Sequence, residues 1–525
     1  MVLSKTTFRA FLCAVGKISV QSSRNYNNII YIASKRNKFN SSYSKFIVAS
    51  AAALGFSLYI AHKNKISCDI DLADVKIRNE IETYEEAISK SRDVLQRIKD
   101  EVGAPGIVIG VSINGKTIWK EGLGYSDVEN RVLCSGDTVM RIASISKSIT
   151  MAAVAKLWEQ GKLDLDKPVQ EYVPYFPQKN FDGKPVTITC RHLVSHLGGI
   201  RHYVKQPNDQ KNDLKNGEEK SSTKKEVQKN EFEYKEYYIK ENYKDVRSSV
   251  DIFKDDPLIA KPGSKFIYST HAWTLISAIV EAAAKEQFRV HMTKLFKKLG
   301  MTNTYIDDND VLIYHRSRNY IKAKNGYLIN APYVNNSYKL AGGGFLSTVG
   351  DLLHFGNAML YSLQFKMTTQ KMSDGNFTET STCNQSASDK NIDCPNDRMS
   401  CKKQILPGYL NSKTVEAMWS PIADYKESKY GMGWAIFPES QDCQYCEENK
   451  YCVYHSGGAI GASSILLILP KECHNEEHID IEFSGVPKGI VVSILTNLQS
   501  INLYKTALTI ANIFDHKRLT IHNNQ

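Results

Sequence analysis

Ser144 and Lys147 are spaced for covalent catalysis by an activated hydroxyl. The string Ser144-Ile-Ser-Lys147 opens the apolar stretch Ser144–Gln160, which is predicted to be a helix, and residues three apart share one face of a helix. A serine hydroxyl is a weak nucleophile near neutral pH, but an unprotonated amine beside it can take its proton. The alternative interpretation is an N-cap serine followed by a solvated lysine, because other S-x-x-K strings occur in polar parts of the chain.

Two later segments carry groups that could complete such a site. Tyr268-Ser-Thr270 precedes an apolar helical pattern, where a tyrosine can relay protons, although a core tyrosine is the alternative. His455-Ser-Gly-Gly458 precedes the strand pattern Ser463–Leu469. Small residues beside an edge strand let a substrate backbone approach closely, and an imidazole with a hydroxyl could bind a carboxylate. A plain hairpin turn is the alternative there.

The elements around these segments predict an α+β fold. Pro105–Ile113 and Lys116–Lys120 are joined by Asn-Gly, which indicates a β-hairpin. Four further apolar patterns predict one element each. Ile77–Glu101 is predicted to be an amphipathic helix, Ser463–Leu469 and Gly489–Thr496 are predicted to be buried strands, and Asn502–Phe514 is predicted to be a closing helix. Because strand patterns lie at both ends of the chain, we expect one antiparallel sheet formed from both ends, with an inserted helical lobe.

Taken in order, the three chemical segments resemble the elements of the serine β-lactamase and penicillin-binding-protein superfamily, which are S-x-x-K, Y-x-N and K-T-G. The match is closest to the class C-like, peptidase S12 type. Flanking segments look like landmarks of the same family: Leu163–Pro177, Thr187–Ile200, Ala341–Met359 and Tyr430–Ile436. The resemblance covers about Ile77–Phe514 without the insertions, and it implies a β-lactamase/transpeptidase-like fold.

The resemblance implies catalytic roles for four residues. Ser144 would be the acylated nucleophile, Lys147 its base, and Tyr268 a general base that shares protons with Lys147. His455 would stand where the K-T-G lysine stands. A cationic His455 would favour loss of a proton from Lys147 and Tyr268, and its charge is expected to depend on pH near neutrality.

Substrate-binding roles are implied for four more residues. Ser456 and Gly457 would complete the K-T-G element, and the backbone N–H groups of Ser144 and Gly458 would form the oxyanion hole. Thr270 replaces the usual asparagine, which removes an amide that both donates and accepts. Together with the histidine at the lysine position, this weakens the case for β-lactams as substrates.

The function implied by the resemblance is that of a serine hydrolase acting on peptide or protein substrates, because the resemblance extends to animal mitochondrial members of the family and mitochondria contain no peptidoglycan. Mitochondrial members of the superfamily also imply self-association into filaments and a role in regulating lipid metabolism. A filament-forming scaffold with little catalysis and a small-ester esterase are the alternatives. No cofactor and no metal are expected, although His192 and His196 are spaced as two ligands on one helix face.

The charge of the chain is concentrated at its N-terminus. The net charge is +11, but residues 1–68 hold ten Lys or Arg and no Asp or Glu. Such a leader predicts mitochondrial import, and the family resemblance together with the segment 46–61 implies the intermembrane space or inner membrane as the destination. The near-neutral remainder, 69–525, argues against nucleic acid as a partner. The uncharged segment 46–61 is either an inner-membrane anchor or a cleaved or soluble element, because about 20 residues are needed to cross a bilayer.

Two polar insertions, 205–247 and 364–404, are predicted within the catalytic domain 69–525, and neither is expected to carry chemistry. The Tyr-rich end of the first insertion predicts a solvated helix from Glu231. Cys443, Cys446 and Cys452 form a local cluster, which is interpreted as loop thiols, a local disulfide or, as an alternative, a zinc site.

Overall fold

The computed structural model describes residues 83–203, 235–365, 407–438, 451–471 and 485–523. The leader, the segment 46–61, most of the two insertions and two of the clustered cysteines, Cys443 and Cys446, lie outside these residues. Their predicted roles, and the boundary at residue 68, therefore stay predictions. Within the described residues, no helix is long and apolar enough to span a bilayer.

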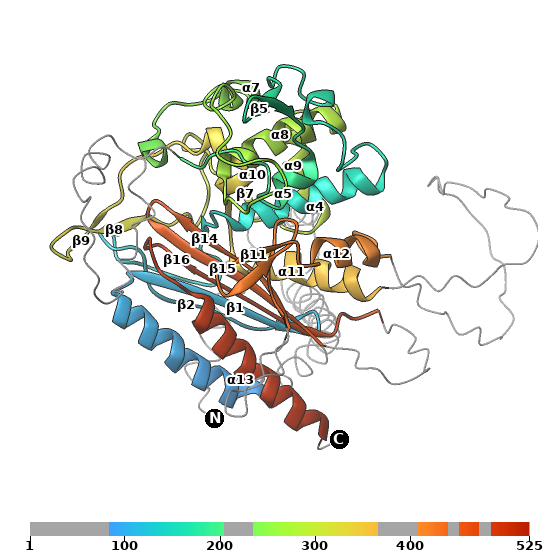
Figure 1. Cartoon of the computed structure of the whole chain (residues 1–525). Coiled ribbons are helices and arrows are strands. Elements are labelled where there is room, and N and C mark those ends of the chain that lie inside the picture. The colour runs from blue at the N-terminus through green and yellow to red at the C-terminus, as the bar shows by residue number, and fades with distance from the viewer. Residues whose placement is uncertain (1–82, 204–234, 366–406, 439–450, 472–484, 524–525) are drawn as a thin grey trace, which may run out of the picture. The chain divides into compact units, whose positions relative to one another are not determined.

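A nine-stranded antiparallel sheet joins the two ends of the chain, as predicted. Its strand order is β11-β12-β13-β14-β15-β16-β1-β2-β3 (Figure 1). The predicted hairpin is confirmed, and β1 also pairs with β16 along its length. The strands of this sheet are β1 (Gly106–Ile113), β2 (Lys116–Asp127), β3 (Val132–Leu133), β11 (Ala423–Tyr425), β12 (Ser428–Tyr430), β13 (Ala435–Phe437), β14 (Cys452–Ala459), β15 (Ala462–Pro470) and β16 (Gly489–Thr496).

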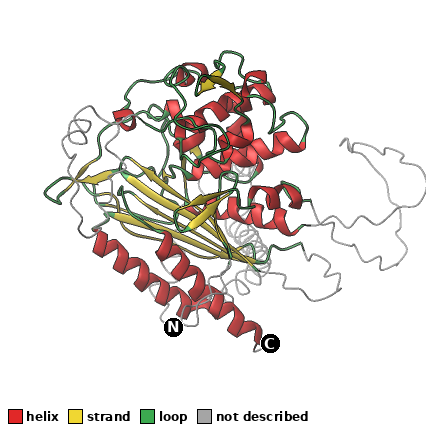
Figure 2. Ribbon diagram, viewed as in Figure 1, coloured by secondary structure: helices red, strands yellow, loops and turns green. Residues whose placement is uncertain are grey.

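Both faces of the sheet are covered by helices, so alternate side chains of the central strands enter two separate cores. On one face, Ile107 and Ile494 pack with Leu95 of helix 83–102 and with Phe514 of α13 (Tyr504–Asn523). On the other face, strand residues such as Val491 pack against α11 (Val349–Gln364) and the helical lobe. Figure 2 shows this layered arrangement.

The helical lobe is built around α4 (Ile145–Glu159), which is buried on nearly every side. A helix that is apolar all round must lie inside a domain. The remaining elements are β4 (Met140–Arg141), η1 (Val169–Glu171), β5 (Lys179–Phe181), β6 (Lys184–Val186), α5 (Cys190–Val194), η2 (Lys235–Tyr238), α7 (Val246–Val250), α8 (Thr270–Ala284), α9 (Phe288–Lys298), β7 (Tyr305–Ile306), β8 (Tyr320–Lys322), β9 (Leu328–Asn330), η3 (Ser337–Lys339), α10 (Leu340–Gly343), β10 (Phe345–Ser347) and α12 (Ser412–Met418).

Two expectations from the sequence need correction. The closing helix continues to Asn523 instead of ending at Phe514. Phe514 is its last large core residue, but an ion pair between Arg518 and Asp515 supports the following turn. The end of the first insertion is not a solvated helix, because η2 inserts the buried Tyr237 into a cluster of aromatic residues.

A buried ion group fixes the strands that lead to Ser144. Arg141 Nε lies 2.9 Å from an Asp307 oxygen, and Arg316 donates to the other oxygen at 2.6 Å. Burial alone would raise the Asp307 pKa, but the two guanidinium groups and the Asn336 amide lower it. Because the folded-state pKa is the lower one, this stabilisation is present at neutral pH and is lost as the pH falls below about 4.

Replacing Asp307 with alanine is therefore expected to lower the free energy of unfolding by about 3–5 kcal/mol, because two buried guanidinium groups lose their counter-charge. Chemical denaturation of the full chain measures this. The control is Asp424→Ala, which removes an exposed partner of Lys429 and should cost less than about 1 kcal/mol. Equal effects of the two substitutions would contradict a structural role for the buried group.

Candidate active site

Ser144 stands at the N-terminal end of α4, directly after a strained residue. Ala143 has a φ of 46°, a left-handed conformation that non-glycine residues seldom adopt and that is concentrated at functional sites. This turn leads the chain from β4 into α4 and leaves the Ser144 side chain partly exposed. In the part of the chain that the structure describes, the Ser144 N–H donates to no backbone carbonyl. It is thus available to an oxyanion.

Lys147 lies one helical turn further and points back to Ser144, as its spacing predicted. Its Nζ lies 3.0 Å from Ser144 Oγ and 2.5 Å from the carbonyl oxygen of Gly342. The side chain is fully buried. Burial favours the neutral amine over the charged form, so the geometry suits proton transfer from the serine hydroxyl.

Tyr268 covers the other side of the Lys147 amine, with Nζ 4.9 Å from the centroid of its ring. The ring packs on His196 at 4.3 Å between centroids, and His196 Nδ1 accepts the Ser269 N–H at 3.1 Å. Burial, with the nearby Lys147 and His455, lowers the His196 pKa well below its usual range. A neutral imidazole therefore holds the Tyr268 segment against the lysine.

His455 lies on β14 among these residues, but it does not carry the charge expected from the sequence. Its Nδ1 lies 2.8 Å from the Ser456 carbonyl oxygen, to which it must donate, and its Nε2 accepts from the Tyr430 hydroxyl at 3.1 Å. Burial is the main cause that lowers its pKa to about 3, and Lys147 lowers it further when it is protonated. The expectation of a charge that changes near neutral pH is therefore wrong.

The predicted binding residues fall in two places. Gly457 packs directly on the turn before Ser144, where Ser464 of the neighbouring strand also donates to the Ile142 carbonyl at 2.7 Å. Ser456 is exposed and Gly458 is partly exposed on the same strand. Thr270 begins α8 on the opposite side, and its N–H donates to His202 Nδ1 at 3.3 Å.

Gly457 allows β14 to approach the nucleophile closely. An alanine Cβ there would overlap the Ser464 hydroxyl and the Ile142 carbonyl and lie 3.0 Å from the Ala143 Cβ. We expect Gly457→Ala to lower kcat/KM by about 100-fold, the cost of misplacing reacting groups by about 1 Å. Ester hydrolysis by the purified variant measures the loss.

Gly350→Ala is the matched control for this substitution, because the nearest atoms to its added Cβ are 3.8 Å away. It should retain the parent rate. A Gly457→Ala enzyme with the parent kcat/KM would mean that β14 does not set the position of Ser144.

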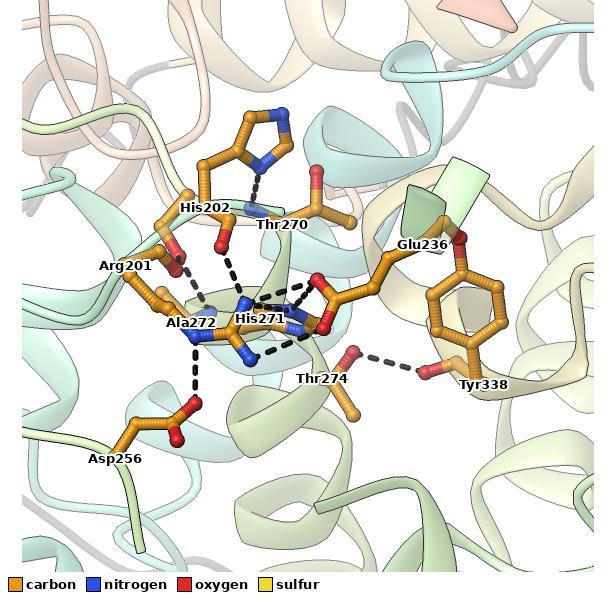
Figure 3. Close-up of polar contacts among 10 residues, drawn as sticks. Arg201, His202, Glu236, Asp256, Thr270, His271, Ala272, Thr274 and Tyr338 are labelled. Carbon is orange, nitrogen blue, oxygen red and sulfur yellow. Dashed lines mark hydrogen bonds and ion pairs between the residues drawn. The ribbon is translucent and has the colours of Figure 1, made fainter. Parts of the chain in front are cut away.

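A charged network stabilises the loop beside Thr270 (Figure 3). Arg201 pairs with Glu236 at 2.9 Å and with Asp256 at 2.5 Å, while its carbonyl accepts the Ser269 hydroxyl at 2.7 Å. Burial would raise the Glu236 pKa, but His271 and Arg201 lower it to about 2. Glu236 lies in the segment predicted as an insertion without chemistry, so the end of that segment supports the site.

Several residues of this site were not predicted to be functional. They are Ala143, His196, His202, Glu236, Tyr430 and Gly342. His196, Tyr430 and Gly342 belong to the flanking landmark segments, which could have indicated them. No sequence signal indicated Ala143 or Glu236, because a left-handed φ and an ion pair across the insertion depend on the folded chain.

The structure gives no metal-like arrangement to the residues considered as ligands. His192 Nδ1 accepts the Thr189 N–H in a helix cap, and His196 Nδ1 accepts that of Ser269. Across the described ranges, no group of three or more His, Cys, Asp or Glu side chains could hold a metal ion. Cys452 is buried on β14 near the Tyr504 hydroxyl.

Comparisons with known proteins agree with the geometry of the site around Ser144. The β-lactamase family model matches residues 92–391. The mouse mitochondrial serine beta-lactamase-like protein LACTB is 45% identical over 83% of this chain and 81% of its own length. Two solved structures share the fold. The octameric penicillin-binding protein homologue from Pyrococcus abyssi is 21% identical with a TM-score of 0.54, and the match covers 82% of this chain and 77% of that chain. The hydrolase EstCE1 is 20% identical with a TM-score of 0.53, and the match covers 82% of this chain and 98% of that chain. The chain therefore belongs to the β-lactamase family and is a serine hydrolase of that family.

Proposed function

We propose that the chain is a mitochondrial serine peptidase that cleaves peptide or protein substrates through an acyl-enzyme on Ser144. The observation that supports this most is the distance of 3.0 Å between Lys147 Nζ and Ser144 Oγ. Lys147 is fully buried whereas Ser144 is partly exposed, so a substrate can reach the hydroxyl while its base stays shielded from water.

In this mechanism the Lys147 amine takes the proton of Ser144 as Oγ bonds to the substrate carbonyl carbon. The N–H groups of Ser144 and Gly458 stabilise the oxyanion. Collapse of the intermediate expels the leaving amine, which receives its proton from Lys147 with the help of Tyr268. A water molecule then attacks the ester, releases the acid and restores the hydroxyl.

His455 acts in this proposal as a neutral positioning residue. Both of its ring nitrogens have partners, Ser456 and Tyr430, so it contributes no positive charge to substrate binding. The catalytic strand β14 is thereby connected to β12 through the Tyr430 hydroxyl.

The mitochondrial part of the proposal is supported by the acid-free leader and by the name of the mouse relative. Self-association is supported by the octameric archaeal homologue. Residence in the intermembrane space or at the inner membrane, and a role in lipid metabolism, are the expectations that the family resemblance adds.

A peptide library tests the proposal. The purified chain, with Ser144→Ala as the blank, is incubated with the library and with neutral p-nitrophenyl esters, and mass spectrometry identifies new peptide termini. Ser144-dependent peptide products are expected. Turnover of the esters without any peptide product would mean that the chain is a small-ester esterase and not a peptidase. Filaments without any Ser144-dependent product would instead favour the scaffold.

A further inference from the structure

Tyr268 is one of three partly exposed aromatic rings that lie together. The other two belong to Phe266 and Tyr425. The centroid of the Tyr425 ring lies 5.4 Å from that of Phe266 and 6.3 Å from that of Tyr268, and the planes of the two tyrosine rings differ by 22°. We call these three rings the aromatic wall. Aromatic side chains that stay open to solvent beside a reactive group are typical of ligand sites.

A buried tyrosine holds the aromatic wall in place. The fully buried Tyr430 ring lies 5.5 Å from that of Phe266 and 5.6 Å from that of Tyr425, between centroids. The Tyr430 hydroxyl in turn donates to His455 on β14. Because the wall is fixed in this way by the strand that flanks Ser144, a ligand that packs on it meets rings that are already ordered. Binding to such a surface costs little side-chain entropy.

Tyr425 reaches the aromatic wall from the edge of the sheet. It is the last residue of β11, which stands at one end of the nine-stranded sheet (Figure 1). The hairpin to β12 pairs Tyr425 with Ser428 and turns at Lys426, whose φ is 55°. Phe266 and Tyr268 come from the segment just before α8. The wall is therefore formed where the sheet meets the helical lobe.

The position of Tyr268 determines which part of a substrate faces the aromatic wall. In the proposed mechanism, the proton that Ser144 loses is returned to the leaving amine through Lys147 and Tyr268. A group that donates this proton must lie within hydrogen-bond distance of the leaving nitrogen. The residue that carries this nitrogen therefore lies against Tyr268, and its side chain is within reach of Tyr425.

We propose that the aromatic wall is the subsite for the leaving-group side of the substrate, and that Tyr425 is its specificity-determining residue. The preferred occupant is an amine with an aromatic side chain, because offset-stacked and edge-to-face ring pairs add to the stabilisation that apolar contact gives. The proposal rests on the function proposed for Ser144 and specifies the residue that follows the scissile bond.

The same subsite receives an added amine when acylation is reversed. The amine nitrogen bonds to the carbonyl carbon of the acyl-enzyme, the bond between that carbon and Ser144 Oγ breaks, and the amine proton passes through Tyr268 and Lys147 to Oγ. The products are an amide and the free serine hydroxyl. Competition between an added amine and water for one acyl-enzyme therefore measures binding at the aromatic wall.

The partition of one acyl-enzyme between two amines tests the proposal. p-Nitrophenyl acetate acylates the full chain at about pH 8, where much of either amine is unprotonated, and phenylalaninamide or alaninamide is added. Mass spectrometry gives the ratio of acetylated amide to acetate, with the Ser144→Ala chain as the blank. We expect phenylalaninamide to be preferred about 3- to 10-fold, the contribution of one aromatic pair. Tyr425→Ala should remove this preference, whereas Tyr425→Phe, which keeps the ring, should retain it.

The matched control is Tyr327→Ala, which removes an exposed tyrosine just before β9 and should keep the parent preference. A change in rate that Tyr425→Ala causes for both amines alike cancels in the ratio, so a purely structural role of Tyr425 would leave the preference unchanged and overturn the proposal.

Saturation-transfer NMR of phenylalaninamide on the Ser144→Ala chain reads the subsite without turnover. Failure of the proposed hydrolase shows as p-nitrophenol release that does not depend on Ser144, and the NMR signal of the bound ring then decides on the subsite alone. This signal is expected in the Ser144→Ala chain and should be lost when Tyr425→Ala is added. Equal partition of the two amines in the parent chain, or a ring signal that survives Tyr425→Ala, would overturn the subsite.

Discussion

Replacement of Ser144 by alanine is expected to abolish covalent labelling by a fluorophosphonate probe and to lower hydrolysis by about 10⁴-fold or more. The hydroxyl is the group that Lys147 contacts at 3.0 Å, and it is partly exposed at the end of α4. Alanine removes the atom that would bond to the probe and leaves the helix intact. Intact-mass spectrometry of the labelled chain, followed by peptide mapping, measures the result.

Ser148→Ala is the matched control, because Ser148 lies one turn further along the same helix and donates to the Gly433 carbonyl at 2.7 Å. This variant should lose a little stability, about 1 kcal/mol, and keep the label. If the Ser144→Ala chain were labelled at the parent rate, the nucleophile would be another residue and the acyl-enzyme mechanism would fail.

The sheet and the nucleophile could be predicted because both depend on local patterns. The Asn-Gly turn defines the β1–β2 hairpin, and the helical period alone brings Lys147 next to Ser144. Apolar runs at both ends of the chain predicted that the two ends share one sheet, and the pairing of β1 with β16 is how the structure joins them. These features need no knowledge of which side chains meet across the fold.

The electrostatics of the site could not be predicted in the same way. The charge of His455 depends on its burial, on the Ser456 carbonyl and on a hydroxyl from Tyr430, 25 residues away. Likewise, Glu236 looked like one acid among many in a polar segment, yet it pairs with Arg201 across that segment. His455, which the family resemblance places at the lysine of the K-T-G element, is thus neutral.

The Lys147→Met substitution is expected to have the second large effect. It should decrease the acylation rate by about 10²–10⁴-fold, which is the usual contribution of a positioned general base. Methionine fills the same volume without an amine. The buried site remains occupied, although the Gly342 carbonyl loses its donor. The melting temperature should therefore shift by a few °C at most. Stopped-flow release of p-nitrophenol gives the acylation rate, and calorimetry gives the melting temperature.

The pH dependence of the residual rate separates loss of the base from simple misfolding. Without an internal base, hydroxide must take the Ser144 proton, so the rate of the Lys147→Met chain should rise steadily with pH, whereas the rate of the parent chain should level off. Lys162→Met, an exposed lysine just after the same helix, is the control and should follow the parent curve. A Lys147→Met chain that acylates at the parent rate with the parent pH profile would assign the base to Tyr268 alone. In that case the contact of 3.0 Å between the lysine and the serine would serve only to position the hydroxyl.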